Sequence, residues 1–406
     1  MSQGSPAAGG QGNRLLVHGV DTTWDGLDPV ELPPVVCCFV EDNLDAARIV
    51  RSAVDGGAEL LLAGAGRRTP ELVEEVREAG FSVREATGEL LPPTVPRPAT
   101  PGRIWLLTSG STGRPKRVAH TLASLTTVTG QQPARTWLCP YAIGAYAWWQ
   151  VVTLGVGLPG QDVVFIEPSD LASWPRIALE AGVTAASGTP TFWRQALFTD
   201  PESLAQVPLE QVTLGGEPVD QAILTRLAEV FPSARISWIY ASSEAGASIA
   251  VHDGRAGFPV EWLGKESAGR ATVRVDGDEL VIASPFRGEG IDAELRTGDR
   301  VEVADGRVVV VGRLASDEIN VGGAKASASE IRDVLQSHPA VLWASVRGRK
   351  APIVGSIVTA DIVVSDPVTT ADLTTWCAER LPDHAVPRRL RFLEEIPIKE
   401  TLKSDV

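Results

Sequence analysis

Short apolar runs alternate with amphipathic segments through most of this chain. This alternation is the feature that most strongly limits the folds that the chain can adopt. The run VVCCFV (35–40) precedes a stretch whose apolar residues recur with helical spacing as far as Gly56 and Gly57, and AELLLAG (58–64) follows. A strand, a helix and a second strand in this order form the unit from which parallel sheets are built. The sequence therefore predicts an α/β fold.

Further segments continue the pattern. The stretch TPELVEEVREAG (69–80) has the features of a helix start, because Thr69 suits the capping position and Pro70 suits the first turn. More strands are predicted at DVVFIEP (162–168), QVTLGG (211–216) and RISWIY (235–240). The proline-rich segment 85–102 is predicted to be a linker.

The sequence changes character near residue 270. The runs at 271–285 and 300–313 alternate apolar and polar residues and are each broken by Asp-Gly, which is typical of antiparallel hairpins. Helix and strand patterns resume from residue 327. We therefore expect a large N-terminal domain of α/β layers with a small β-subdomain (15–313), followed by a small α+β domain (314–406). The start, residues 1–14, is predicted to be a disordered tail.

Charge and composition exclude several kinds of partner. The chain has 37 Lys and Arg against 51 Asp and Glu, a formal charge of −14. Nucleic acids and anionic membranes both require a basic surface, so we expect neither as a partner. Cysteines 37, 38, 139 and 377 have no C-x-x-C spacing and fit buried, reduced thiols. With no signal-peptide pattern and no long apolar run, a cytoplasmic protein is expected.

The stretch LLTSGSTGRPKRVAH (106–120) carries the chemistry that stands out most. A loop of Gly, Ser and Thr offers backbone N–H groups and hydroxyls that suit a phosphate chain, and Lys116 adds a positive charge. It is not the usual P-loop, which requires Gly-Lys-Ser/Thr, because Pro115 precedes the lysine. The alternative interpretation is a flexible linker.

The segment TSGSTGRPK (108–116) resembles the phosphate-loop signature of the adenylate-forming enzymes, which include acyl-CoA and aryl-CoA synthetases, nonribosomal-peptide adenylation domains and luciferases. Five downstream segments resemble further elements of that family in the same order. They are LGGEP (214–218), YASSE (240–244), RTGD (296–299), GRLASDEINVGGAKASASEI (312–331) and IPIKETLKSDV (396–406).

The resemblance implies a fold with a mobile C-terminal domain and a set of nucleotide contacts. The ATP phosphates would be held by Thr108, Ser109, Gly110, Ser111, Thr112, Gly113 and Lys116, with Lys325 nearby. Adenine would contact Gly215, Gly216, Glu217, Tyr240 and Ala241. Asp299 would accept both ribose hydroxyls, and Arg313 would contact AMP. Ser243 would donate to the α-phosphate, and Glu244 would hold Mg²⁺, a hard cation that prefers oxygen ligands.

The same resemblance implies the reaction. A carboxylate would attack the α-phosphorus of MgATP to give acyl-AMP and pyrophosphate, with Lys403 as the adenylation lysine. The thiol of CoA, or of a phosphopantetheine arm such as that of an acyl carrier protein, would then displace AMP. Between these steps the C-terminal domain would turn about a hinge at Ser316 or Asp317 and bring Gly322 and Gly323 to the thiol tunnel.

Four features depart from the family pattern. About 105 residues precede the loop, fewer than most relatives have, and the hinge segment contains one extra residue. The segment CPYAIGAYAWWQ (139–150) lacks the histidine that many acyl-CoA synthetases carry there. Leu402 stands where the family usually has glycine. These departures suggest an uncommon substrate or a divergent branch.

Bulky side chains in the segments that would form the acid pocket favour a small or aromatic acid over a long acyl chain. The pocket residues are predicted to be Tyr141, Tyr146, Trp148, Ser187 and Gly188, although tryptophans such as Trp148 are more often core residues. Two alternatives stay open. An adenylating enzyme could pass its activated acid to a nitrogen nucleophile, by amide formation or nitrite-dependent diazotisation. A non-catalytic nucleotide-binding module is the other, for which Leu402 is the only direct indication.

Overall fold

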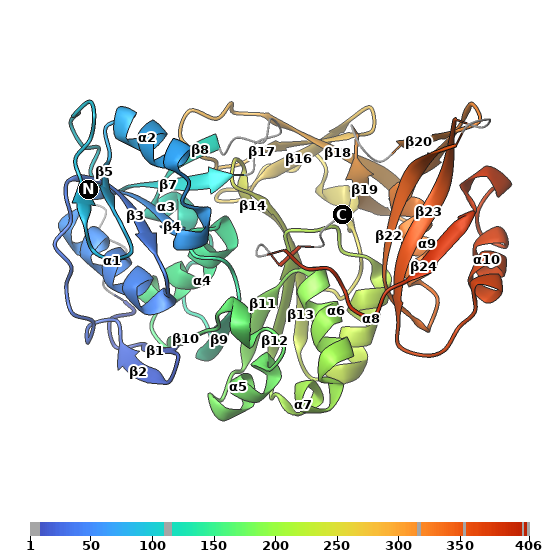
Figure 1. Ribbon diagram of the computed structural model, residues 1–406, viewed down its shortest axis with the longest axis horizontal. Helices are drawn as coiled ribbons and strands as arrows, with labels where there is room; N and C mark the ends of the chain where they lie inside the picture. Colours follow the sequence, from blue (N-terminus) through green and yellow to red (C-terminus); the bar gives the residue numbers. More distant parts are fainter. Residues whose placement is uncertain (1–8, 109–115, 315–317, 352–354, 400–401, 404–406) are drawn as a thin grey trace.

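The computed structural model describes residues 9–108, 116–314, 318–351, 355–399 and 402–403 (Figure 1). Its first sheet has six strands in the order β6-β5-β3-β4-β7-β8. These strands are β3 (Val35–Val40), β4 (Glu59–Gly64), β5 (Ser82–Arg84), β6 (Leu90–Leu91), β7 (Arg103–Thr108) and β8 (Lys116–Thr121). Every residue of β3 is buried, because one face packs against helix α1 (Asn43–Gly56) and the other against helix α2 (Pro70–Glu78). A strand covered on both faces reads as a continuous apolar run.

A second sheet has eight strands in the order β14-β13-β12-β11-β9-β10-β1-β2 and lies at the centre of the molecule (Figure 1). They are β1 (Arg14–Val17), β2 (Val20–Thr23), β9 (Arg135–Cys139), β10 (Gln161–Phe165), β11 (Ala185–Gly188), β12 (Gln211–Gly215), β13 (Arg235–Ser242) and β14 (Gly246–Val251). Helices α3 (Leu122–Leu125), α4 (Tyr146–Gly157), α5 (Trp174–Glu180), α6 (Pro190–Thr199), α7 (Pro201–Gln206) and α8 (Gln221–Val230) connect or cover its strands. The strands from β9 to β13 and β1 are parallel neighbours, as the βαβ pattern predicts.

A smaller antiparallel sheet follows, with the order β15-β19-β18-β17-β16. Its strands are β15 (Phe258–Pro259), β16 (Thr272–Asp276), β17 (Glu279–Ala283), β18 (Leu295–Ala304) and β19 (Arg307–Arg313). The two predicted Asp-Gly hairpins are β16–β17 and β18–β19.

The C-terminal domain begins with the hairpin β20 (Glu318–Val321) and β21 (Ala324–Ser327). Its three-stranded sheet consists of β22 (Val341–Ala351), β23 (Gly355–Val364) and β24 (Arg389–Phe392). Helices α9 (Ala328–Gln336) and α10 (Thr370–Ala378) pack with this sheet around a core of their own. The predicted fold class, a large α/β domain with a β-subdomain and a small α+β domain, is confirmed.

The C-terminal domain contacts α6 and α8 of the N-terminal domain. Gln336 of α9 donates from Nε2 to Oδ2 of Asp220, 3.1 Å away, and Asp220 also pairs with Arg194 of α6. Arg226 of α8 donates to the carbonyl oxygens of Pro339 and Val341 at 2.6 and 3.0 Å. These polar contacts fix the orientation in which the last residues of the chain reach the large domain.

The predicted disordered tail, 1–14, is wrong over residues 9–14. Asn13 is buried, and its amide donates to the carbonyl oxygens of Gly155 and Leu158 at 2.7 and 2.6 Å. Arg14 starts β1, which pairs with β10. A short polar segment of this kind folds because a distant strand offers it a partner.

The predicted linker 85–102 is not a free connection, because it is held on a buried carboxylate. Glu59 is fully buried at the start of β4 and accepts from both terminal nitrogens of Arg97 at 2.8 and 2.9 Å, from the N–H of Thr100 and from Nε1 of Trp105. Burial alone would raise the pKa of Glu59, but these hydrogen bonds outweigh it and lower the pKa to about 2.

We predict that Glu59→Ala lowers the free energy of unfolding by about 3 kcal/mol, since it leaves Arg97 without its buried partner. Because the pKa of Glu59 in the folded state lies below the usual value of 4.5, the carboxylate contributes fully to the free energy of unfolding above pH 4.5. This contribution is lost as the pH falls from 4.5 toward 2. Urea unfolding between pH 7 and pH 3 measures both effects. Glu89→Ala, at an exposed site, is the control. An equal pH dependence in Glu59→Ala and the parent chain would contradict the assignment.

Candidate active site

Loops that follow parallel strands meet at one edge of the eight-stranded sheet. Strands β9, β11, β12 and β13 are parallel, so their carboxyl ends lie at the same edge. The chain passes from β9 to β10 on one side and then returns to β11 on the other side, which makes the gap between β9 and β11 a topological switch point. Open α/β sheets bind their ligands at such points. The candidate active site lies at this edge.

Strands β9 and β11 separate there. Their pairing ends at Leu138 and Ala186, although β11 continues to Gly188. Tyr141, just after β9, places its hydroxyl 2.9 Å from Oγ of Ser187 on β11. Two of the residues predicted to line the acid pocket therefore span the crevice.

The start of helix α6 forms one side of the crevice. A Cβ atom on Gly188 would lie 2.2 Å from Cδ1 of Phe192, so only glycine lets this ring pack on the end of β11. Thr189 caps α6 by accepting from the N–H of Phe192 at 3.0 Å, and its hydroxyl donates to the carbonyl oxygen of Leu402. One hydroxyl therefore both begins a helix and holds the last described segment of the chain.

Lys403 lies against the loop after β12. A Cβ atom on Gly216 would be 3.5 Å from Cε of Lys403 and 3.7 Å from Cγ2 of Thr189. Desolvation lowers the pKa of Lys403 and Arg313 adds to the decrease, whereas the carboxylates of Glu217 and Asp299 oppose it. The ammonium group thus lies among charged groups from three separate elements.

Glu217 follows β12, and its side chain is held by the start of α6. Its Oε2 accepts from the N–H of Thr191 at 3.0 Å, in the first turn of the helix, where the helix dipole favours a negative charge. This anchor holds a carboxylate near the Lys403 ammonium.

A second cluster joins the end of β13 to the small sheet. The Tyr240 hydroxyl donates to Oδ2 of Asp299, and Nε of Arg313 lies 2.9 Å from Oδ1 of the same carboxylate. Burial raises the pKa of Asp299, although Tyr240, Arg313 and Lys403 favour its charged form. Each carboxylate oxygen has two lone pairs, so Asp299 has capacity to accept further hydrogen bonds from a diol. A register shift between Tyr240 and Ala241 marks a bulge at this point of β13.

Ser243 and Glu244 follow β13 and are positioned through their backbone. The carbonyl oxygen of Ser243 lies 2.7 Å from Nε2 of His120, and that of Glu244 accepts from the N–H of Gly288 at 2.9 Å. Burial lowers the pKa of His120, and its Nδ1 lies 3.0 Å from Oγ of Ser124. His120 therefore links β8 of the first sheet to the site as a structural residue.

The predicted phosphate loop connects two antiparallel strands. Thr108 ends β7 and Lys116 begins β8, and the two residues are paired. In a P-loop the phosphate-binding segment joins a strand to a helix, whereas here the segment joins two paired strands, as expected for a motif in which Pro115 precedes the lysine. Ser109, Gly110, Ser111, Thr112 and Gly113 lie outside the described residues, as do the predicted hinge residues Ser316 and Asp317.

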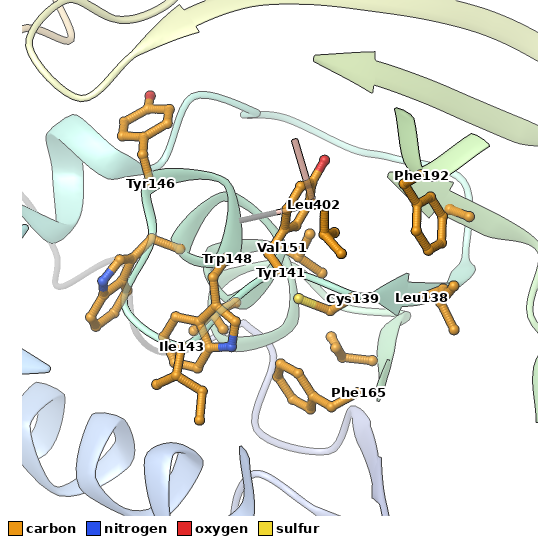
Figure 2. Packing of buried hydrophobic residues seen from close by; sticks show 14 of the residues in the cluster. Leu138, Cys139, Tyr141, Ile143, Tyr146, Trp148, Val151, Phe165, Phe192 and Leu402 are labelled. Atoms are coloured by element: carbon orange, nitrogen blue, oxygen red, sulfur yellow. The ribbon is translucent and has the colours of Figure 1, made fainter. Parts of the chain in front are cut away.

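Two of the predicted acid-pocket residues lie elsewhere. Trp148 is fully buried, and its Nε1 donates to Oδ1 of Asn43 in α1 at 2.8 Å, so this side chain belongs to the core and its assignment to the pocket is wrong. Tyr146 points away from the crevice (Figure 2), and its hydroxyl accepts from the N–H of Ala247 at 2.8 Å. Helix α4 is apolar on all sides, so its sequence does not reveal which face meets the site.

The predicted thiol-tunnel residues Gly322 and Gly323 form the turn between β20 and β21, both with positive φ. Lys325 lies on the same hairpin, where its Nζ is 2.9 Å from Oε2 of Glu318. In Figure 1 this hairpin is far from the C-terminal segment that carries Lys403. This arrangement of the domains therefore presents Lys403, and not the glycine turn, to the sheet edge.

The sequence did not point to Thr189 or to Leu402 as site residues. Thr189 could have been found as a helix cap, because Pro190 follows it and suits the first position of a helix. Leu402 stood out only as a departure from glycine, whereas its side chain is 1% exposed and joins the apolar cluster that contains Tyr141 and Phe192 (Figure 2).

The described residues contain no group of three or more His, Cys, Asp and Glu side chains arranged to hold a metal ion by themselves. A single carboxylate at Glu244 fits a cation that phosphate oxygens would also bind, since Mg²⁺ usually takes one or two carboxylates together with substrate phosphates. None of the described helices is long and apolar enough to span a bilayer.

Comparison with known proteins agrees with this geometry. A family model described as AMP-binding enzyme matches residues 35–289, and one described as AMP-binding enzyme C-terminal domain matches residues 330–403. This chain belongs to the AMP-binding enzyme family. The family predicted from the motifs is therefore confirmed.

Relatives of this AMP-binding enzyme include several named ligases and synthases. The 4-chlorobenzoate–CoA ligase of Arthrobacter sp is 29% identical over 269 residues, which cover 59% of this chain and 50% of that protein. Enterobactin synthase component E of Escherichia coli (strain K12) is 27% identical, over 76% of this chain and 64% of that protein. The chain thus spans between half and two thirds of the length of these relatives. Feruloyl-CoA synthase of Amycolatopsis sp is 27% identical, over 87% and 79%.

Solved structures show the same fold. The anthranilate CoA ligase AuaEII in complex with anthranoyl-AMP has a TM-score of 0.75 at 18% identity, with 97% of this chain and 93% of that chain covered. The amide bond synthetase McbA from Marinactinospora thermotolerans has a TM-score of 0.68 at 20% identity, with 98% and 96% covered.

We predict that Lys403 reacts with an acylating reagent at lower pH than a lysine in an unstructured peptide, because a lowered pKa leaves more of its amine neutral at a given pH. Pulse labelling with acetic anhydride between pH 7 and pH 10, followed by peptide mass spectrometry, gives the midpoint for each lysine. In Glu217→Gln, which removes a carboxylate that favours the ammonium, the Lys403 midpoint should fall further. A midpoint for Lys403 in the parent chain equal to that of the peptide lysine would refute the prediction.

Proposed function

We propose that this AMP-binding enzyme activates a small or aromatic carboxylic acid with MgATP, releases pyrophosphate, and transfers the acyl group from the acyl-AMP to the thiol of CoA or of a phosphopantetheine arm. The observation that carries the proposal is the position of Lys403, which approaches Gly216 while its charge interacts with Glu217, Asp299 and Arg313. Family membership gives the reaction class, and this position gives a role to the terminal lysine.

The nucleotide would lie along the carboxyl edge of β12 and β13. Gly215 and Gly216 leave room for adenine beside the ring of Tyr240, and Asp299 would accept the ribose hydroxyls through its remaining lone pairs. Ser243 would donate to the α-phosphate, and Glu244 would hold the Mg²⁺ that offsets the phosphate charge. The loop that starts at Thr108 and ends at Lys116 would hold the β- and γ-phosphates.

The acid would enter the crevice between β9 and β11. Its carboxylate oxygen attacks the α-phosphorus, the bond from that phosphorus to the pyrophosphate oxygen breaks, and acyl-AMP forms. Phosphoryl transfer depends mainly on positioning and charge stabilisation, which the Lys403 ammonium would supply between the carboxylate and the α-phosphate. A thiolate then attacks the acyl carbon and displaces AMP. The aromatic acids in the names of the chlorobenzoate and ferulate ligases support an aromatic substrate class.

An assay of pyrophosphate and AMP tests the proposal. The purified chain is incubated with MgATP and a panel of benzoates, cinnamates and short aliphatic acids, with and without CoA or an amine. Pyrophosphate that depends on the acid, with AMP release that depends on CoA or on a phosphopantetheinylated carrier, supports the proposal. Acyl transfer that needs an amine would assign the second step to a nitrogen nucleophile. Nucleotide binding without pyrophosphate under every condition would make the chain a non-catalytic module and sink the proposal.

Lys403→Ala should lower the acid-dependent rate of pyrophosphate release by at least about 100-fold, because a preorganised charge at the transition state is lost. Thioester formation from a supplied acyl-AMP should be largely retained. The control is Lys265→Ala, which removes an exposed lysine with the same change of charge. Equal losses in both half-reactions would contradict the role given to Lys403.

Asp299→Asn should raise the KM for ATP at least about 10-fold, because the ribose would lose charge-assisted hydrogen bonds. The KM for the acid should change much less. Asp305→Asn, on the exposed turn between β18 and β19, controls for the loss of one carboxylate from the same sheet. A larger change in the KM for the acid than for ATP would contradict the ribose assignment.

A further inference from the structure

Leu402 is buried in the large domain although it belongs to the segment that follows the C-terminal domain's sheet. Its side chain is 1% exposed and is part of the main hydrophobic cluster, together with Cys139, Tyr141 and Phe192. Figure 2 shows it beside Tyr141, over the end of β9. A leucine directly before Lys403 therefore reaches the crevice between β9 and β11.

The backbone at Leu402 is held in a conformation that leucine rarely adopts. Its φ is +60°, in the left-handed region, where a side chain is disfavoured and glycine is preferred. The Thr189 hydroxyl donates to its carbonyl oxygen, and its N–H donates to the carbonyl oxygen of Lys399 at 2.8 Å. Uncommon backbone conformations persist where the surrounding structure fixes them, and they gather at functional sites.

The crevice that Leu402 enters has the features of a ligand site. It opens where the pairing of β9 and β11 ends, at the switch point of the sheet. The hydroxyls of Tyr141 and Ser187, 2.9 Å apart, span the crevice, while Phe192 and Leu402 provide apolar surface. A few polar groups in an otherwise apolar cleft are typical of a small-molecule pocket.

We propose that Leu402 is a specificity-determining residue that forms a removable wall of the acid pocket and limits the size of the acid at the adenylation step. This inference rests on the proposed function. The wall and the adenylation lysine are neighbours in the chain, so the two side chains enter and leave the site together. An acid too large to fit beside Leu402 prevents Lys403 from docking at Gly216.

This coupling predicts where discrimination appears in the kinetics. Oversized acids still enter the crevice when the terminal segment is absent, so their binding is little affected. They are adenylated slowly, because Leu402 and Lys403 cannot dock over them. Size selection therefore acts mainly on kcat for pyrophosphate release and much less on the KM for the acid.

The test compares Leu402→Ala and Leu402→Gly with the parent chain on benzoates that carry 4-substituents of increasing size. In the parent chain kcat falls as the substituent grows. In both variants the ratio of kcat for the largest acid to kcat for benzoate rises at least about 10-fold, because the missing side chain leaves room for the substituent. Glycine also suits the positive φ at this position, so Leu402→Gly measures the change in the kcat ratio if the alanine variant folds poorly. A uniform change of kcat for all acids, or a change confined to KM, would overturn the proposal.

Leu381→Ala is the matched control, because Leu381 is a buried leucine in the core of the C-terminal domain. This variant should keep the size profile of the parent chain, and a profile shifted like that of Leu402→Ala would count against the proposal.

A binding measurement separates this inference from the proposed function. Acyl-sulfamoyl adenosines mimic acyl-AMP without reacting. Calorimetry therefore measures how tightly the pocket binds each acyl group, even if no acid gives pyrophosphate. Unlike the free acid, an analogue of acyl-AMP gains contacts with Leu402 and Lys403 when they dock over it, and a large acyl group prevents this docking. The binding preference for a small over a large acyl group should therefore fall at least about 10-fold in Leu402→Ala. If the parent chain releases pyrophosphate but the binding preference is unchanged in Leu402→Ala, only the size-limiting role of Leu402 is rejected. Failure of every acid in the parent chain, with a changed preference, rejects only the proposed function.

Discussion

The docking of two residues, Leu402 and Lys403, on the carboxyl edge of the central sheet is the contact on which the site depends. Thr189 holds the segment through the Leu402 carbonyl, and the Lys403 side chain lies against Gly216, whose positive φ suits glycine. Without this contact the edge would hold Tyr240 and Asp299 but no lysine. The reactive arrangement is therefore a property of the two domains together, and contacts such as Gln336 with Asp220 contribute by orienting the C-terminal domain.

Electrostatics explain how an acidic chain can hold an anionic nucleotide. The formal charge of −14 gives no general attraction for phosphate, so the positive groups must be local. Lys403 and Arg313 provide them at one edge. Glu217 and Asp299 favour the charged form of Lys403, and the Asp299 carboxylate lies 2.9 Å from Nε of Arg313. Positive and negative groups are thus paired in the site itself. In the proposed reaction the ATP phosphates and the acid would bring the negative charge that Lys403 meets.

The sequence predicted strands such as β3, the antiparallel hairpins and the family because these depend on local signals. The all-apolar run of β3, the Asp-Gly hairpins and the motif residues around Tyr240 and Asp299 are each contained in a few residues. It failed where a distant partner decides the outcome. Asn13 folds because β10 and the end of α4 lie beside it, about 145 residues later in the chain. Trp148 was misassigned because α4 is apolar all round, and only the position of Asn43 shows which way the indole points.

Leu402 shows why a departure from a family pattern deserves a physical reading before it is taken as damage. A residue with a Cβ atom at φ +60° costs roughly 1–2 kcal/mol relative to glycine. Full burial of a leucine side chain contributes a similar or larger amount, about 1.5–3 kcal/mol, in the opposite direction. The substitution is therefore close to neutral for docking when the crevice is empty. It becomes unfavourable when a large acid occupies the space that the side chain needs, because the backbone strain then remains without the burial that offsets it. With glycine at position 402, docking of this segment would not depend on the size of the acid. With leucine there, the proposed wall makes docking depend on it.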